Sequence, residues 1–115
     1  MKNRGQIATL LMKELTSYTQ ARSEKNYEQC VHHLGRAHVL SQRNWFRHIY
    51  VHFLMLEYSW ARRDWREVMG QIIRLVATVP GHLFKKLPIG NTGWSNIPIM
   101  KRLPLPNDFA RLFED

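Results

Sequence analysis

Prolines divide this chain of 115 residues into two unequal parts. Pro80 is the first of five prolines, and the others follow at positions 88, 98, 104 and 106. A proline inside a helix removes a backbone donor and clashes with the preceding turn. We therefore expect a single domain over residues 1–115, with a helical core over residues 1–80. Residues 81–106 should form an extended arm packed on that core.

Four helices are expected in the core. Apolar side chains recur at helical spacing in the first, over about residues 6–22. The second should follow Asn26 and end near Leu40, and the third should span 44–61. The fourth should follow Asp64 and end near Val79, before Pro80. Asn26 and Asp64 are typical N-cap residues.

The second and fourth helices also share a capping pattern. Gln29 and Glu67 stand three residues after the two caps, as in a capping box. Tyr27 and Trp65 directly follow the caps and lie 38 residues apart. This spacing predicts an all-α fold of two antiparallel helical hairpins, either tetratricopeptide-like or a plain four-helix bundle.

The third helix, "NWFRHIYVHFLMLEYSWA", is apolar around almost its whole circumference. Such a helix is normally central and buried. We therefore also expect Trp45, Trp60 and Trp65 to belong to the core. The polar positions His48 and His52 are four residues apart and share one face.

The arm has its own pattern. "IGNTG" is typical of a turn, because Asn91 and its neighbouring glycines tolerate positive φ. Beyond it, alternate positions are apolar, which predicts an extended segment lying on the helices. These apolar positions are Ile97, Ile99, Leu103 and Leu105. A short helix over residues 107–115, capped by Asn107 or Asp108, would bury Phe109, Leu112 and Phe113.

Composition restricts the setting and the partners of the protein. A single cysteine, Cys30, forms no internal disulfide, and no apolar run is long enough for a signal peptide or a membrane span. We therefore expect a cytoplasmic protein without membrane contact.

The net charge of +8 favours acidic partners, including nucleic acid. Arg62, Arg63 and Arg66 cluster before the fourth helix and are candidates to bind an anion or a partner.

Four segments taken in series resemble a bacterial family, domain of unknown function 3703. They read "HLGRAHVLSQ", "RHIYVHFLML", "RRDWREVMGQIIRL" and "PIGNTGWSN". The resemblance covers about residues 25–106. It implies that the Asn91 turn and four histidines belong to the recurrent pattern of the family, and it implies no reaction. These histidines are His33, His38, His48 and His52.

The same four histidines are candidate metal ligands. His48 and His52 can share one metal ion through their imidazole nitrogens. His38, on the neighbouring helix, can approach His48 across a short turn, and His33 is a further candidate. The alternative is that the rings donate to carbonyls or carboxylates at a tight helix–helix contact.

Three functions remain open from the sequence. The first is a small interaction or adaptor module that binds another protein or a second copy of the chain. The second is a metal-binding protein for zinc, copper or nickel, which imidazole ligands suit. The third is a basic nucleic-acid-binding protein. The chain lacks a phosphate loop, a nucleophile elbow and a dense carboxylate cluster, so we do not expect an enzyme.

Overall fold

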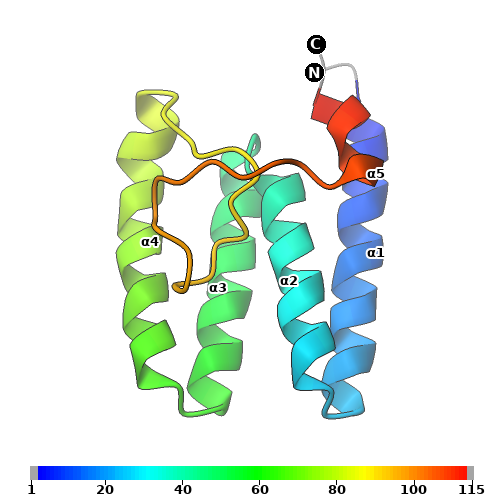
Figure 1. Cartoon of the computed structure of the whole chain (residues 1–115), viewed down its shortest axis with the longest axis vertical. Coiled ribbons are helices and arrows are strands. Elements are labelled where there is room, and N and C mark those ends of the chain that lie inside the picture. Colours follow the sequence, from blue (N-terminus) through cyan, green and yellow to red (C-terminus); the bar gives the residue numbers. More distant parts are fainter. Residues whose placement is uncertain (1–2, 114–115) are drawn as a thin grey trace.

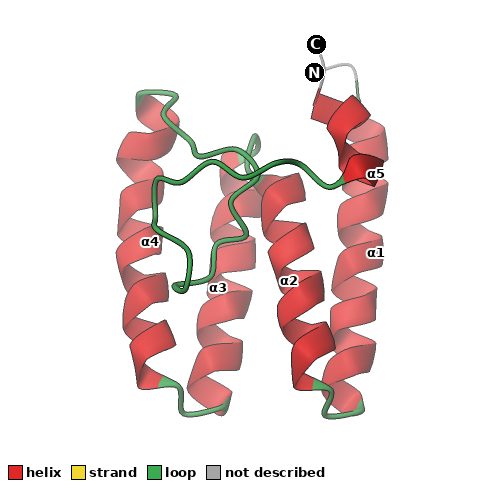
Figure 2. Ribbon diagram, in the orientation of Figure 1, coloured by secondary structure: helices red, strands yellow, loops and turns green. Residues whose placement is uncertain are grey.

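The computed structural model describes residues 3–113, and within this range it contains helices and loops but no strand (Figure 2). The predicted all-α fold of two helical hairpins is confirmed. The four long helices are α1 (Arg4–Ser23), α2 (Tyr27–Ser41), α3 (Trp45–Ala61) and α4 (Trp65–Leu83). A short helix, α5 (Asn107–Ala110), continues into the 3-10 turn η1 (Arg111–Phe113).

Side-chain caps set the starts of α2, α3 and α4. The side chain of Asn26 accepts a hydrogen bond from the backbone N–H of Gln29, and Asp64 does the same for Glu67. The predicted starts of α2 and α4 are therefore confirmed. The preceding residues, Lys25 and Arg63, have φ angles of 56° and 58° and end α1 and α3 in the left-handed conformation. Both hairpin turns thus combine a residue with positive φ and a following residue whose side chain caps the next helix.

Consecutive helices lie side by side in the order of the chain (Figure 1). The hairpins α1–α2 and α3–α4 are each closely packed, and α2 also packs on α3. Helices α1 and α4 therefore form the two edges of the array (Figure 1). Each inner helix has neighbours on two sides, whereas each edge helix has one.

The predicted end of the fourth helix was wrong, because α4 continues through Pro80 to Leu83. Proline lacks only its own donor, and the following backbone bonds still form. Phe84 N donates to Pro80 O, and Lys86 N donates to Gly81 O. The helix ends where Lys85 adopts a φ of 55°.

The chain after α4 crosses one face of the array as an extended loop (Figure 1). The apolar alternation predicted for it is present: Ile97, Ile99, Leu103 and Leu105 are half-buried. Phe109 has no exposed surface, and Leu112 and Phe113 are buried with it in the core. The expected cap at Asn107 or Asp108 was wrong, because Pro106 occupies the N-cap position without a side-chain bond. Asp108 instead pairs with Arg36 of α2.

Helix α3 is not buried all round, so that expectation was wrong. One side packs through Val51, Met55 and Tyr58 into the core. The other side leaves large aromatic rings in contact with solvent. The predicted core residues Trp45, Trp60 and Trp65 are 42%, 61% and 52% exposed. In residues 3–113, no helix combines the length and the apolar character needed to cross a membrane.

Candidate metal centre

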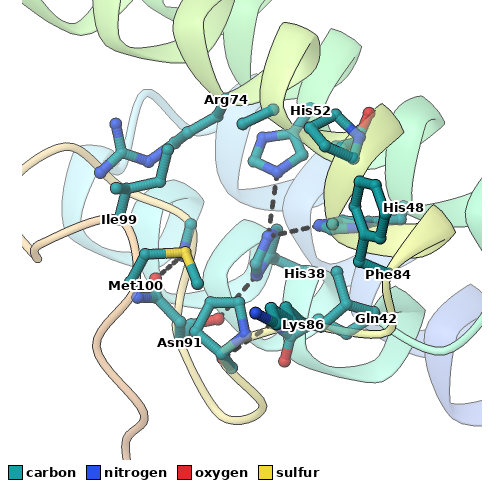
Figure 3. Close-up of a pocket in the computed structure, with 17 residues that line it drawn as sticks. His38, Gln42, His48, His52, Arg74, Phe84, Lys86, Asn91, Ile99 and Met100 are labelled. Carbon is teal, nitrogen blue, oxygen red and sulfur yellow. Dashed lines mark hydrogen bonds between the residues drawn. The ribbon is translucent and has the colours of Figure 1, made fainter.

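Three of the predicted histidines meet inside the fold, beneath the loop that follows α4. His38 comes from α2, and His48 and His52 come from successive turns of α3. The short turn between α2 and α3 brings the end of one helix next to the start of the other. The three rings are at most 4% exposed and point toward one another (Figure 3).

The Nε2 atoms of His48 and His52 both lie close to Nε2 of His38. The Nε2 atom of His38 lies 3.0 Å from Nε2 of His48 and 3.0 Å from Nε2 of His52. One nitrogen from each ring lies within 4.8 Å of those of the other two. Ligands bound to zinc at about 2.0–2.1 Å in tetrahedral geometry lie about 3–3.5 Å apart. The two distances from His38 Nε2 are therefore close to those in a set of metal ligands, and the three ligand atoms lie within 4.8 Å of one another.

The outer nitrogens of His38 and His52 fix where their protons lie. His38 Nδ1 lies 2.6 Å from the carbonyl oxygen of Asn91, which only accepts, so this nitrogen donates. His52 Nδ1 lies 2.7 Å from Gln71 Oε1. The amide nitrogen of Gln71 donates to Glu67 and to the carbonyl of Gly93, so its oxygen must face His52. Both histidines therefore carry a proton on Nδ1.

It follows that the Nε2 atoms of neutral His38 and His52 present lone pairs to each other. Two lone pairs at 3.0 Å repel, and no hydrogen lies between them to form a bond. A shared proton or a shared metal ion would turn this repulsion into attraction. Burial makes a proton costly here, because a charged imidazolium loses its hydration.

The third ligand is oriented by a fourth histidine. His48 Nδ1 lies 2.8 Å from Nε2 of His82, near the end of α4. When His48 donates through Nδ1, its Nε2 lone pair joins the other two. Each ring of the cluster thus has a partner for its outer nitrogen, which is the usual way in which proteins orient metal-binding histidines.

The electrostatic setting keeps the three rings neutral. Burial, followed by repulsion from His52 and His48, lowers the pKa of His38 well below its ordinary value. Burial is also the main cause that lowers the pKa of His48 to about 3 and that of His52 to about 4. Neutral imidazole is the form that binds metal ions, so the site is in its ligand form at neutral pH.

One side of the cluster opens on a cavity of about 270 Å³ (Figure 3). Its walls come from α4, from the loop and from the end of α2, and most of them are apolar. They include Phe84, Leu87, Pro88, Ile99 and Met100. Lys86 and Arg74 are the cations among the lining residues. A metal ion held by three imidazoles here would keep a coordination position facing the cavity.

Glycine at position 93 lets the loop approach the histidines. Gly93 has a φ of 86°, and a Cβ atom built on it would lie 2.6 Å from the His38 ring. Its carbonyl accepts from Gln71, and its N–H donates to the side chain of Asn91. The backbone of Gly93 thus bonds to the side chains of Asn91 and Gln71. These two residues are the partners of His38 and His52.

Polar side chains anchor this loop to α4. The carboxylate of Glu67 accepts from the N–H and the hydroxyl of Ser95, and it also accepts from Gln71. Arg74 donates to the carbonyls of Ile97 and Gly70. The chain His52–Gln71–Glu67 therefore connects a ring of the cluster to a carboxylate, which raises the basicity of the ring as a ligand.

His33 does not join the cluster. Its Nδ1 lies 2.8 Å from the carboxylate of Glu14 on α1, so it makes a contact between α1 and α2. Cys30 is buried on the same helix and is a free thiol. Of the four candidate ligands, the fold brings together His38, His48 and His52.

The arginines proposed to bind an anion lie at the turn between α3 and α4. The guanidinium of Arg62 lies 3.6 Å from the centre of the Tyr27 ring, a cation–π contact that joins the two hairpins. Arg63 is the residue with positive φ that ends α3. Arg66 is exposed on the first turn of α4. Their binding role stays a prediction, as does the expected lack of enzymatic activity.

Two residues of the site were missed by reasoning from the sequence. His82 lies 34 residues after His48, and no spacing rule connects the two. Gln71 stands in the apolar run "MGQIIRLVA", where a buried polar residue signals a partner that only the fold identifies.

The chain belongs to the family of proteins of unknown function DUF3703, whose model matches residues 5–113. The resemblance seen in the sequence is thereby confirmed. No curated protein and no solved structure matches the chain. The family assignment covers both hairpins and the loop that completes the histidine cluster.

Proposed function

We propose that this protein binds a transition-metal ion through the Nε2 atoms of His38, His48 and His52. One observation carries the proposal: Nδ1 of His38 and of His52 must donate outward, so their Nε2 lone pairs face each other at 3.0 Å. A cation between them accounts for this arrangement. A purely structural contact between the rings would instead place a hydrogen between two nitrogens.

Zinc is the ion that fits first, with copper and nickel as further candidates. Three histidines with an open fourth position are a known arrangement for zinc sites that bind water or a small ligand. Imidazole also suits copper and nickel. None of the described residues that line the cavity is acidic, and Arg74 and Lys86 add positive charge. The fourth ligand is therefore expected to be an anion, such as hydroxide or a carboxylate, because it would offset this buried charge.

A metal titration tests the proposal. Wild type should bind one zinc ion per chain, measured against a chromophoric chelator. Replacing both His48 and His52 by alanine should weaken binding by more than ~100-fold, because removing ligands costs more than the 10–100-fold typical of outer-shell partners. His33→Ala is the matched control and should bind like wild type. Circular dichroism checks that all three proteins are folded.

Two outcomes of this titration would contradict the proposed metal site. Equal weak binding by wild type and the double variant would assign the histidines to helix contacts. Loss of binding in His33→Ala alone would place the site elsewhere on α2.

The interaction role expected from the sequence has separate support. Large apolar side chains on α3 and α4 are exposed, including Phe46 at 80% and Leu83 at 71%. Contiguous apolar surface on a soluble domain marks a contact with another molecule. For the nucleic-acid alternative, the net charge of +8 is the supporting observation.

A further inference from the structure

The outward face of α4 is apolar over its whole length. Its exposed residues repeat with the 4–3–4–3–4 spacing of pairing helices. These residues are Trp65, Met69, Ile72, Val76, Val79 and Leu83, which are between 41% and 71% exposed. Ile73 lies beside them and is 56% exposed, and Arg66 is the charged residue on this side. We call this surface the α4 stripe.

Aromatic residues of α3 extend the stripe. The rings of Trp60 and Trp65 lie 5.2 Å apart at one end of the hairpin, and Trp45 lies 6.3 Å from His82 at the other. Because the helices are antiparallel, the middle of α3 lies next to the middle of α4. Phe53, in the middle of α3, is 54% exposed.

Helices α2 and α4 differ in how much of their apolar surface is covered. Ile72 of α4 corresponds to Leu34 of α2 at the spacing of 38 residues. Leu34 has no exposed surface, whereas Ile72 is 41% exposed. Helix α2 lies between two helices, and α4 is at an edge (Figure 1). The α4 stripe thus lies on a helix whose one long-helix neighbour is α3.

The other edge helix, α1, has the opposite character. Its exposed positions are mostly polar or charged, such as Gln6, Lys13, Thr16 and Gln20. A polar edge is what closes a helical array toward solvent. Only the α4 edge lacks this kind of surface.

We propose that the α4 stripe pairs with the α4 stripe of a second copy of this chain. A two-fold dimer needs a face that is complementary to itself, and an apolar stripe with a heptad spacing meets this requirement. Exposed aromatic rings contribute much of its area, since each ring buries ~150–250 Å² when fully covered. The stripe and the adjoining α3 rings together expose on the order of 1,000 Å², and a stable dimer needs about 800 Å² per partner.

Charge gives the dimer a distinctive salt dependence. Two copies with a net charge of +8 each repel one another. Added salt screens this repulsion, and the apolar contact is not weakened by it. Dimerisation should therefore become tighter as salt rises. Binding of the same face to anionic lipid would show the reverse, because it depends on the attraction between the lipid and the positively charged protein.

Sedimentation velocity tests the proposal with two matched variants. Val76→Glu places a charge at a position that is 70% exposed in the centre of the stripe, and Met12→Glu does so at a position of α1 that is 63% exposed. Wild type and Met12→Glu should be dimers at micromolar concentration, more tightly at 0.5 M than at 0.05 M NaCl. Val76→Glu should be a monomer with unchanged helix content and unchanged zinc binding.

Three results would overturn the dimer. In the first, wild type sediments as a monomer at 100 µM in both salts, and in the second, Val76→Glu associates as wild type does. In the third, monomeric wild type floats with vesicles containing phosphatidylserine and is released by salt, which would assign the stripe to a membrane surface. Because the metal site lies on the opposite side of α4, failure here leaves the zinc measurements unaffected.

Discussion

Zinc should raise the melting temperature of the wild-type protein by roughly 10 °C when its free concentration is 100 times the dissociation constant. Such saturation adds about 2.7 kcal/mol to the free energy of unfolding when the unfolded chain does not bind the ion. The physical reason is that the fold holds the Nε2 lone pairs of His38 and His52 3.0 Å apart, and the metal ion removes their repulsion. Differential scanning calorimetry with and without zinc measures the shift.

His38→Ala should abolish this shift, because Nε2 of His38 lies 3.0 Å from Nε2 of both other rings. The melting temperature of this variant differs from that of wild type before zinc is added. The comparison is therefore between the two zinc-induced shifts and not between the two melting temperatures. His33→Ala, which removes a ring outside the cluster, should retain the shift of wild type. An equal shift in His38→Ala would mean that zinc binds at another place.

A chain that ends after Lys86 should have no stable fold. This truncation keeps α1 to α4 whole and removes the loop, α5 and η1. It takes from the core Trp94, Phe109, Leu112 and Phe113, each at most 8% exposed. Removing one large buried aromatic side chain costs about 3–5 kcal/mol, whereas a domain has only about 5–15 kcal/mol of stability in total.

Urea unfolding followed by circular dichroism measures this loss. The truncated chain should show no cooperative transition, and it should bind a dye that reports exposed apolar surface. Phe109→Ala in the full chain should lower the free energy of unfolding by about 3–5 kcal/mol. Asn96→Ala changes an exposed position of the loop and should leave stability unchanged. A truncated chain that unfolds at the same urea concentration as wild type would show that the loop contributes nothing to the core.

The helical part of this fold could be predicted because its signals are local. Asn26 and Asp64 cap helices through atoms three residues away, so the sequence contains both partners. The end of α4 was missed because Pro80 removes only one donor, and the true terminator is a lysine with positive φ. Nothing in the identity of Lys85 signals that conformation.

The histidine cluster could be predicted only in part, because only some of its contacts are local in the sequence. His48 and His52 share a face by helical spacing alone, and the short turn brings His38 near them. The selection among candidates depends on tertiary partners: Glu14 holds His33 away, and Asn91 and Gln71 orient His38 and His52. These contacts join residues between 19 and 53 positions apart, which local patterns do not encode.

The exposure of α3 was mispredicted because apolar content was taken as a sign of burial. A helix is covered on all sides only when neighbours exist on all sides, and within residues 3–113 the long helices that pack on α3 are α2 and α4. Phe46 and Phe53 are exposed in the single chain for this reason. A second copy of the chain would cover part of this surface.

Anomalous diffraction at the zinc edge, from crystals grown with zinc, tests the central claim most directly. We predict one strong peak per chain, about 2.0–2.1 Å from Nε2 of His38, His48 and His52, with a fourth ligand on the side of the cavity. The donors on Nδ1 should still face Asn91 and Gln71. A peak at His33 and Glu14, or three ordered rings around a point without zinc in crystals that hold the ion elsewhere, would contradict it.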